Sequence, residues 1–309
     1  MKTAFVFSGQ GAQYIGMGRE LFDKEKIVQD TFQEASDVLG YDVAELCFSE
    51  NDRLNETMYT QPAILTVTIA IYRLLKEKGY QPDVVAGLSL GEYSALVASN
   101  ALSFKEAVQL VAKRGQYMTE AAPTGTGKMV AVMNADRSLI EQVCQEAAEL
   151  GIVSPANYNT PQQIVIGGEV AAVDQAVLLL KEAGVKRMIP LKVSGPFHTA
   201  LLEPAAKQLA EELRPIEFTE MTIPVISNTT AQIMSQAEIK NLLEQQVMSA
   251  VRFADSIETM KKMAVDTIIE VGPGKTLSGF IKKIDKELKV ARVEDEQTLS
   301  ETVALLAGR

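Results

Sequence analysis

The stretch Asp83-Val84-Val85-Ala86-Gly87-Leu88-Ser89-Leu90-Gly91 joins a short apolar run to a helix-like run over residues 92–99. A sharp turn from a strand into a helix leaves no room for side chains two residues before and two residues after its central serine. Gly87 and Gly91 meet that requirement. The turn also presents the Ser89 hydroxyl at a helix N-terminus, where unpaired N–H groups favour negative charge. Although G-x-S-x-G arises by chance in many chains, this context predicts a nucleophile elbow.

The composition is that of a soluble globular protein. Its 309 residues suffice for one large domain or for a main domain with a smaller insertion. The chain has no apolar run of about 18 residues and opens on a strand-like run at 3–7, not on a signal peptide, so we expect a cytoplasmic protein. The net charge of −10 argues against nucleic-acid binding, which needs a basic footprint. Cys47 and Cys144 lie far apart and outside any metal motif, so we expect no metal site.

Helical periodicity alternates with short apolar runs along the chain, which is typical of an α/β protein with a mainly parallel sheet. Four runs are predicted as strands of that sheet, at residues 3–7, 84–88, 223–227 and 267–271. Long helices are predicted over residues 61–78 and 104–121. The second of these begins at a capping box, Ser103-Phe104-Lys105-Glu106.

The middle of the chain predicts a separate subdomain. Its elements follow as strand 129–134, helix 137–150, strands 153–158 and 163–167, helix 170–183 and strand 186–190. This βαββαβ order predicts a ferredoxin-like unit over residues 126–193, inserted into a domain formed by residues 1–125 and 194–309. The helix over 170–183 carries an apolar stripe of Val170, Val173, Val177 and Leu180. The chain is expected to return near Ser194-Gly195-Pro196, leaving a cleft between the two parts.

Acyl transfer through a serine needs a base and donors for the oxyanion. His198 is the only histidine of the chain and follows the return crossing, so it is predicted at the rim of the cleft. A lone histidine in a loop is usually structural, and the elbow is what makes this one a candidate base. The N–H of Leu90 is one predicted oxyanion donor. The second is expected from residues 7–13, a glycine-rich loop after the first strand.

Arg114 stands out by its position on the predicted helix 104–121. The polar stripe of that helix is formed by other residues, namely Lys105, Gln109, Lys113, Gln116 and Glu120. Arg114 lies off the solvent face, where a guanidinium needs a carboxylate and binds it through a planar fork. That carboxylate belongs either to an Asp or Glu of the chain or to a substrate.

Six motifs are spread over nearly the whole chain: FSGQGAQ at 7–13, GLSLGEYSA at 87–95, KRGQYM at 113–118, ANYNTP at 156–161, GPFHT at 195–199 and EVGPGKTLSGF at 270–280. In order and spacing they resemble the malonyl-CoA:acyl carrier protein transacylases of type II fatty acid synthesis. The resemblance implies an α/β-hydrolase-like core with a ferredoxin-like insertion. It also implies transfer of a malonyl group from malonyl-CoA, through a Ser89 acyl-enzyme, to the phosphopantetheine thiol of acyl carrier protein in fatty acid biosynthesis. The CoA thioester and phosphopantetheine then enter as substrates, with no bound cofactor, and we expect a monomer.

The same resemblance assigns roles to individual residues. Ser89 would be the nucleophile, His198 its base, and the backbone carbonyl of Gln246 the group that orients His198. Backbone amides of Gln10 and Leu90 would hold the oxyanion, and Arg114 the free carboxylate of malonyl. The remaining predicted substrate contacts are Phe197, which is similar to the aromatic residue that accompanies malonyl selection, Met118 and Asn157.

Two other classes share these features: a serine hydrolase or thioesterase, which passes the acyl group to water, and a non-catalytic scaffold that only binds carrier protein. Carrier proteins are acidic and so is this chain, which predicts a local basic docking surface near the cleft. The candidates are Lys181, Lys186, Arg187, Lys275, Lys282 and Lys283.

Overall fold

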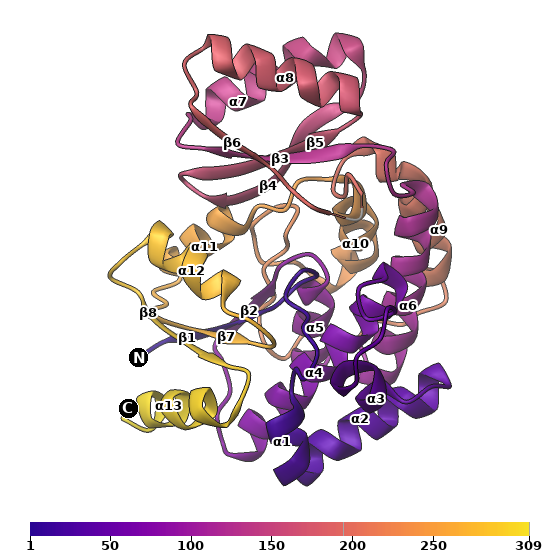
Figure 1. Cartoon of the computed structure of the whole chain (residues 1–309). Helices are drawn as coiled ribbons and strands as arrows, with labels where there is room; N and C mark the ends of the chain where they lie inside the picture. Colours follow the sequence, from indigo (N-terminus) through magenta and orange to yellow (C-terminus); the bar gives the residue numbers. More distant parts are fainter. Residues whose placement is uncertain (194, 309) are drawn as a thin grey trace.

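The computed structural model describes residues 1–193 and 195–308. Figure 1 shows two sheets, one in the body of the molecule and one in a separate layer above it. The sheet in the body is parallel, in the strand order β2-β1-β7-β8. Its strands are β1 Thr3–Phe7, β2 Val84–Gly87, β7 Thr267–Val271 and β8 Lys289–Val293. The predicted α/β class with a parallel sheet is confirmed.

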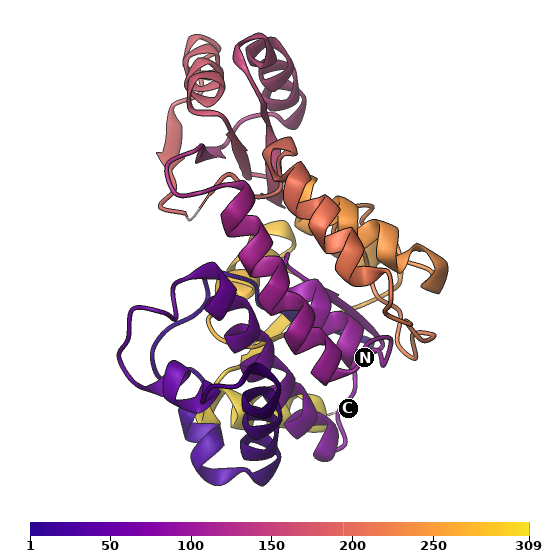
Figure 2. The ribbon, with the colours of Figure 1, turned by 90° about the vertical axis from the view of Figure 1, so that its right-hand side faces the viewer.

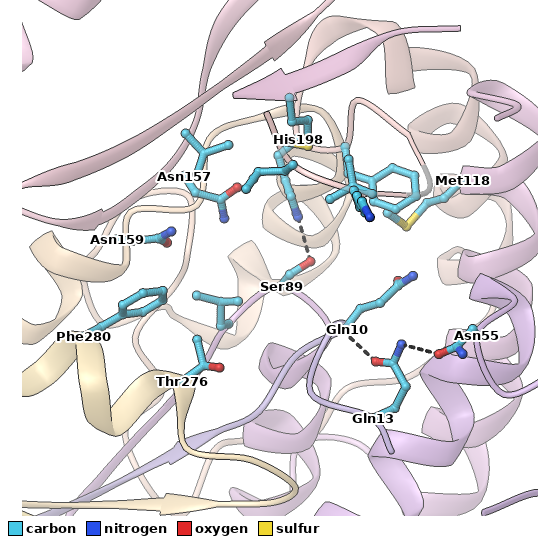
Figure 3. A pocket seen from close by; sticks show the side chains of 18 residues that line it. Gln10, Gln13, Asn55, Ser89, Met118, Asn157, Asn159, His198, Thr276 and Phe280 are labelled. Atoms are coloured by element: carbon cyan, nitrogen blue, oxygen red, sulfur yellow. Dashed lines mark hydrogen bonds between the residues drawn. The ribbon is translucent and has the colours of Figure 1, made fainter. Parts of the chain in front are cut away.

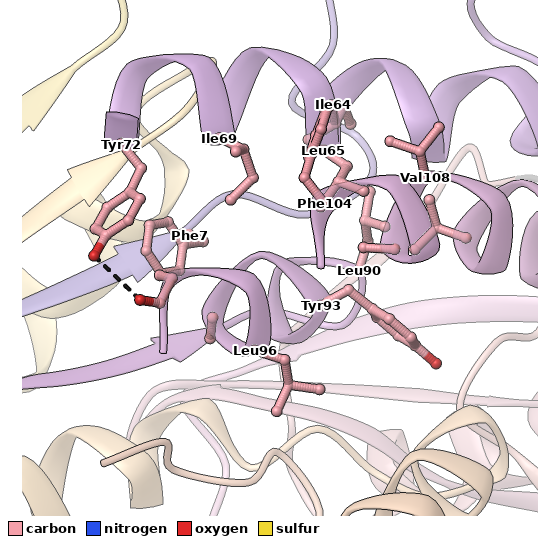
Figure 4. Close-up of a cluster of buried hydrophobic side chains, with 14 of the residues drawn as sticks. Phe7, Ile64, Leu65, Ile69, Tyr72, Leu90, Tyr93, Leu96, Phe104 and Val108 are labelled. Carbon is pink, nitrogen blue, oxygen red and sulfur yellow. Dashed lines mark hydrogen bonds between the residues drawn. The ribbon is translucent and has the colours of Figure 1, made fainter. Parts of the chain in front are cut away.

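Helices cover both faces of the parallel sheet, which is why β1, β2 and β7 are buried along their whole length. Phe5 and Phe7 join a large core that α4, α5 and α6 complete, whereas Ala4 and Val6 point to a smaller core under α11 and α12. Figure 4 shows part of the larger core, with Phe7 beside Tyr72, Tyr93 from α5, and Leu90 just before that helix. The helices of this body are α1 Arg19–Lys24, α2 Lys26–Leu39, α3 Val43–Phe48, α4 Thr57–Glu77, α5 Gly91–Ala98, α6 Phe104–Ala121, α9 Glu203–Leu213, α10 Ile239–Met248, α11 Phe253–Lys262, α12 Thr276–Ile284 and α13 Glu296–Ala307.

The second sheet is antiparallel and has the strand order β4-β5-β3-β6. Its elements are β3 Lys128–Met133, α7 Arg137–Ala147, β4 Val153–Thr160, β5 Gln163–Gly168, α8 Val170–Glu182 and β6 Arg187–Pro190. The predicted βαββαβ order is therefore confirmed, and Figure 2 shows α7 and α8 side by side on the face that points away from the body. One detail of the predicted stripe on α8 is wrong: Val170, the first residue of the helix, is exposed. Ala172, Val173, Ala176 and Leu180 are buried, and the predicted Val177 is partly buried against the same core.

Two predictions about the parallel sheet need correction. The segment 223–227 forms no strand of the sheet; it runs beside β2 and makes a single bridge, Val225 to Val85. Pro224 in this segment has no N–H to donate, which limits its pairing. Strand β8 was not predicted, because its alternating Lys-Val-Ala-Arg-Val pattern at a sheet edge lacks a continuous apolar run.

Strand β4 and helix α7 both bind the small sheet to the body. Main-chain hydrogen bonds join Ala156 and Tyr158 of β4 to Val251. Arg137, at the start of α7, forms an ion pair with Asp255 at 2.9 Å. Ser194, part of the predicted return crossing, lies outside the described residues. Within the described ranges, no helix is both long and apolar enough to cross a membrane.

Candidate active site

The turn between β2 and α5 has the geometry of a nucleophile elbow. Ser89 has φ 56°, a left-handed conformation that a non-glycine residue rarely adopts. A Cβ on Gly87 would lie 1.9 Å from the backbone of Gly91, and a Cβ on Gly91 would lie 2.2 Å from the carbonyl oxygen of Phe7. Both positions therefore have to be glycine for the serine to stand between strand and helix, as the sequence predicts.

The Ser89 hydroxyl lies beside the imidazole of His198. Ser89 Oγ is 2.7 Å from His198 Nε2, and His198 Nδ1 is 2.8 Å from the backbone carbonyl oxygen of Gln246. Because a carbonyl oxygen only accepts, the Nδ1 atom carries the proton and Nε2 is free to accept from the serine. Figure 3 shows this pair at the centre of the pocket. The predicted trio of Ser89, His198 and Gln246 is thus brought together.

His198 is 5% exposed. Burial, and after it the positive charge of Arg114, lower the pKa of His198 to about 4. The imidazole is therefore neutral at physiological pH and ready to accept a proton.

Arg114 is buried beneath the nucleophile, as its place on α6 predicts. Its Nη2 atom donates to Ser89 Oγ at 3.2 Å and to Gln246 Oε1 at 2.9 Å, and Nη1 donates to Gln61 Oε1 at 2.8 Å. The Nε–H group has no hydrogen-bond partner among the described residues. All of these acceptors are neutral, and no ion pair joins Arg114 to a described carboxylate. The guanidinium next to Ser89 therefore has no described carboxylate in direct contact with it.

The loop after β1 packs directly on the elbow. A Cβ on Gly9 would lie 2.3 Å from the carbonyl oxygen of Leu88, so this close approach requires glycine. The contact brings Gln10 next to the start of α5, where the backbone N–H of Leu90 lies. Neither of these two N–H groups donates to a described backbone carbonyl, so both are free to bind an oxyanion.

A pocket of about 280 Å³ opens over Ser89 between the two sheets. The predicted residues Phe197, Met118 and Asn157 all line it, together with Asn159 and Phe280 (Figure 3). Lys192 also lines this pocket, although it was not among the predicted docking residues. Lys186 and Arg187 instead line a separate hollow at the other end of β6. The prediction that they lie near the cleft is wrong, because the sequence does not tell which end of an edge strand points toward it.

Three buried polar residues around the site were missed. Gln61, Glu92 and Asn228 are each at most 1% exposed. Asn228 Oδ1 accepts from the N–H of Ser89 at 2.7 Å, and its Nδ2 donates to the carbonyl oxygen of Gly87. Glu92 directly follows the elbow, within the motif GLSLGEYSA at 87–95, which was the one signal available for it. Gln61 and Asn228 are distant in sequence, and no local pattern marks them.

A model of the acyl transferase domain family matches residues 4–301. The malonyl CoA-acyl carrier protein transacylase of Bacillus subtilis is 46% identical over 308 residues, which cover 99% of this chain and 97% of that protein. The Escherichia coli K12 protein of the same name is 42% identical over 305 residues, covering 98% and 99%. This chain belongs to the malonyl CoA-acyl carrier protein transacylase family.

Solved structures of this transacylase family have the same fold. The crystal structure of MCAT from Streptococcus pneumoniae is 61% identical, covers 100% of both chains and superposes with a TM-score of 0.97. A malonyl-transacylase solved in complex with its type II PKS acyl-carrier protein is 42% identical, covers 98% of this chain and 99% of that chain, and has a TM-score of 0.95. The resemblance stated from the motifs is confirmed.

Proposed function

We propose that this chain is an [acyl-carrier-protein] S-malonyltransferase, which moves a malonyl group from malonyl-CoA through Ser89 to the phosphopantetheine thiol of acyl carrier protein in fatty acid biosynthesis. The observation that carries the proposal is the contact of Ser89 Oγ with both His198 Nε2, at 2.7 Å, and Arg114 Nη2, at 3.2 Å. A base and a cation without a described direct carboxylate partner at one hydroxyl suit an acyl group that ends in a carboxylate.

The first half-reaction acylates the serine. Ser89 Oγ gives its proton to His198 Nε2 and bonds to the thioester carbon. The N–H groups of Gln10 and Leu90 hold the resulting oxyanion. When the intermediate collapses, the C–S bond breaks, the proton passes from His198 to the sulfur, and CoA leaves.

The second half-reaction is the reverse with a different thiol. The phosphopantetheine thiol gives its proton to His198 and attacks the Ser89 ester, whose oxygen recovers the proton as the bond breaks. Arg114 holds the malonyl carboxylate in both steps, because leaving a buried guanidinium unpaired is costly and so disfavours neutral acyl groups. Met118, Phe197 and Asn157 line the space around the acyl group. Both thioesters enter as substrates and no bound cofactor is required.

Carrier protein is expected to approach the mouth of the pocket. Lys192 lines this pocket and becomes a further candidate contact. Lys275 remains a candidate because it is the neighbour in sequence of Thr276, which also lines the pocket. A cytoplasmic location, a monomeric state and the division at residues 126–193 stay predictions from the sequence. Size-exclusion chromatography with light scattering tests the monomeric state.

Release of CoA distinguishes the transferase from the two alternatives. With malonyl-CoA alone, we expect about one equivalent of CoA per enzyme, then none until carrier protein bearing phosphopantetheine is added. Steady release without the carrier would indicate a hydrolase, and no release at all would indicate a scaffold. Ser89→Ala is the control and is expected to release no CoA.

A further inference from the structure

Glu92 is a fully buried carboxylate that does not line the pocket. Its Oε1 atom accepts from the backbone N–H of Asn228 at 2.7 Å, and its Oε2 accepts from Gln246 Nε2 at 2.9 Å. No described Lys or Arg forms an ion pair with it. Burial raises the pKa of Glu92 to about 7, while the N–H of Asn228, the charge of Arg114 and the amide of Gln246 favour its charged form. Burying a carboxylate costs desolvation free energy, so we expect Glu92 to have a specific role.

The contacts of Gln246 indicate that role. Its side-chain Nε2 donates to Glu92 Oε2 and to the carbonyl oxygen of Ser89, each at 2.9 Å, while its Oε1 accepts from Arg114 Nη2 at 2.9 Å. Acceptors therefore face one end of the amide and a donor faces the other. If the amide were turned over, its N–H groups would point at the guanidinium and its oxygen at the carboxylate. Gln246 Nε2 also lies 3.3 Å from Asn228 Oδ1, so Glu92 supplies the one charged acceptor among three that fix which end of Gln246 meets Arg114.

The guanidinium is held in turn by two amide oxygens, those of Gln246 and Gln61. We infer that Glu92 is a positioning residue that sets the Arg114 guanidinium for the substrate's carboxylate by orienting the side-chain amide of Gln246. This inference rests on the proposed function, in which Arg114 holds the malonyl carboxylate. It adds a residue that never touches the substrate and yet determines the preference for a carboxylate-bearing acyl group.

The test is the ratio of kcat/KM for malonyl-CoA to that for acetyl-CoA, measured as acylation of Ser89. Glu92→Gln removes the charge and turns an N–H group toward one of the two donors, Gln246 Nε2 or the backbone N–H of Asn228. It is expected to lower the ratio about tenfold, the effect of weakening one hydrogen bond to a charged group. Glu106→Gln, an exposed residue on α6, is the matched control and should leave the ratio unchanged. A folded Glu92→Gln enzyme with an unchanged ratio would overturn the inference.

A double-mutant cycle separates this relay from a direct charge effect of Glu92 on Arg114. Gln246→Ala removes the amide and keeps the main-chain carbonyl that binds His198, and it is expected to lower the ratio by itself. In the Gln246→Ala background, Glu92→Gln should then add nothing. An undiminished further loss would show that the carboxylate acts through space, which contradicts the relay. Should Glu92→Gln fail to fold, an unchanged ratio in Gln246→Ala overturns the inference instead.

Arg114→Ala distinguishes the inference from the proposal beneath it. If Arg114→Ala lowers the malonyl-to-acetyl ratio and the Glu92 and Gln246 variants do not, the positioning role fails while the proposed function stands. If Arg114→Ala leaves the ratio unchanged, the proposed role of Arg114 fails, and the inference fails with it.

Discussion

Arg114 Nη2 lies 3.2 Å from Ser89 Oγ, so the buried cation of the site touches the nucleophile itself. This short distance limits the substrate. An acyl group attached to Ser89 can reach the guanidinium only if its carboxylate is very close to its carbonyl carbon, as in malonyl. The contact also places positive charge next to the oxygen that must lose its proton, which favours the alkoxide.

Replacing Arg114 by Ala is expected to lower kcat/KM for malonyl-CoA about 10- to 100-fold more than that for acetyl-CoA. The basis is the loss of hydrogen bonds to a charged carboxylate, each about 1.5–3 kcal/mol. Arg114→Lys keeps the charge without the planar fork, so its malonyl-to-acetyl ratio of kcat/KM should lie between the ratios of the wild type and of Arg114→Ala. Stopped-flow measurement of CoA release with each thioester checks this. Equal losses for both substrates would remove the proposed role of Arg114.

His198 is the only histidine, so its imidazole gives unambiguous signals in an NMR titration. Burial and the charge of Arg114 together lower its pKa to about 4, so we expect the ring to remain neutral down to about pH 5. Arg114→Met removes the positive charge and should raise the midpoint of the His198 titration. A midpoint near 6.5 in the wild-type protein would show that the imidazole is solvated, contrary to the structure.

Glycine substitutions test the packing of the elbow. A methyl group on Gly91 would meet the carbonyl oxygen of Phe7 at 2.2 Å, so Gly91→Ala should reduce the free energy of unfolding by about 1–3 kcal/mol or more and impair acylation. Gly279 offers a matched control, because it lies within α12 with no atom near its added Cβ. Gly279→Ala is expected to stabilise by about 0.5–1 kcal/mol. Urea unfolding of both variants gives the comparison, and similar stabilities would contradict the tight elbow.

The sequence was most informative where one local pattern specifies one conformation. Gly87, Ser89 and Gly91 predict the elbow because only glycine fits there, and the absence of Arg114 from the polar stripe of α6 predicts its burial. Strand β8 was not predicted, since at a sheet edge its side chains alternate and half of them are polar. Asn228 and Gln61 could not be found either. They reach the site from distant segments, and their partners are the backbone of the elbow and the guanidinium, which only the folded chain brings near.

The pH dependence of stability should reveal two opposed titrations. The folded-state pKa of His198 is below its unfolded value of 6.5, so the unfolded state binds more protons and stability falls as the pH drops from about 6.5 to about 4. The folded-state pKa of Glu92 is above its unfolded value of 4.5, so stability falls as the pH rises from about 4.5 to about 7. Each effect is on the order of 3 kcal/mol, and in the wild type they largely cancel.

Single variants separate the two contributions. Relative to wild type, His198→Gln should gain stability as the pH is lowered from 7 to 4.5, and Glu92→Gln should lose it. Chemical unfolding at several pH values measures both. Parallel curves for wild type and either variant would mean that the replaced group does not titrate as described.

The most direct measurement is mass spectrometry of the enzyme after brief mixing with malonyl-CoA. Digestion should yield a peptide that carries one malonyl group on Ser89, and the group should disappear when carrier protein with its phosphopantetheine thiol is added. His198→Ala should form this ester far more slowly. A malonyl group on another residue, or carrier protein malonylated at the normal rate by a Ser89→Ala enzyme, would contradict transfer through Ser89.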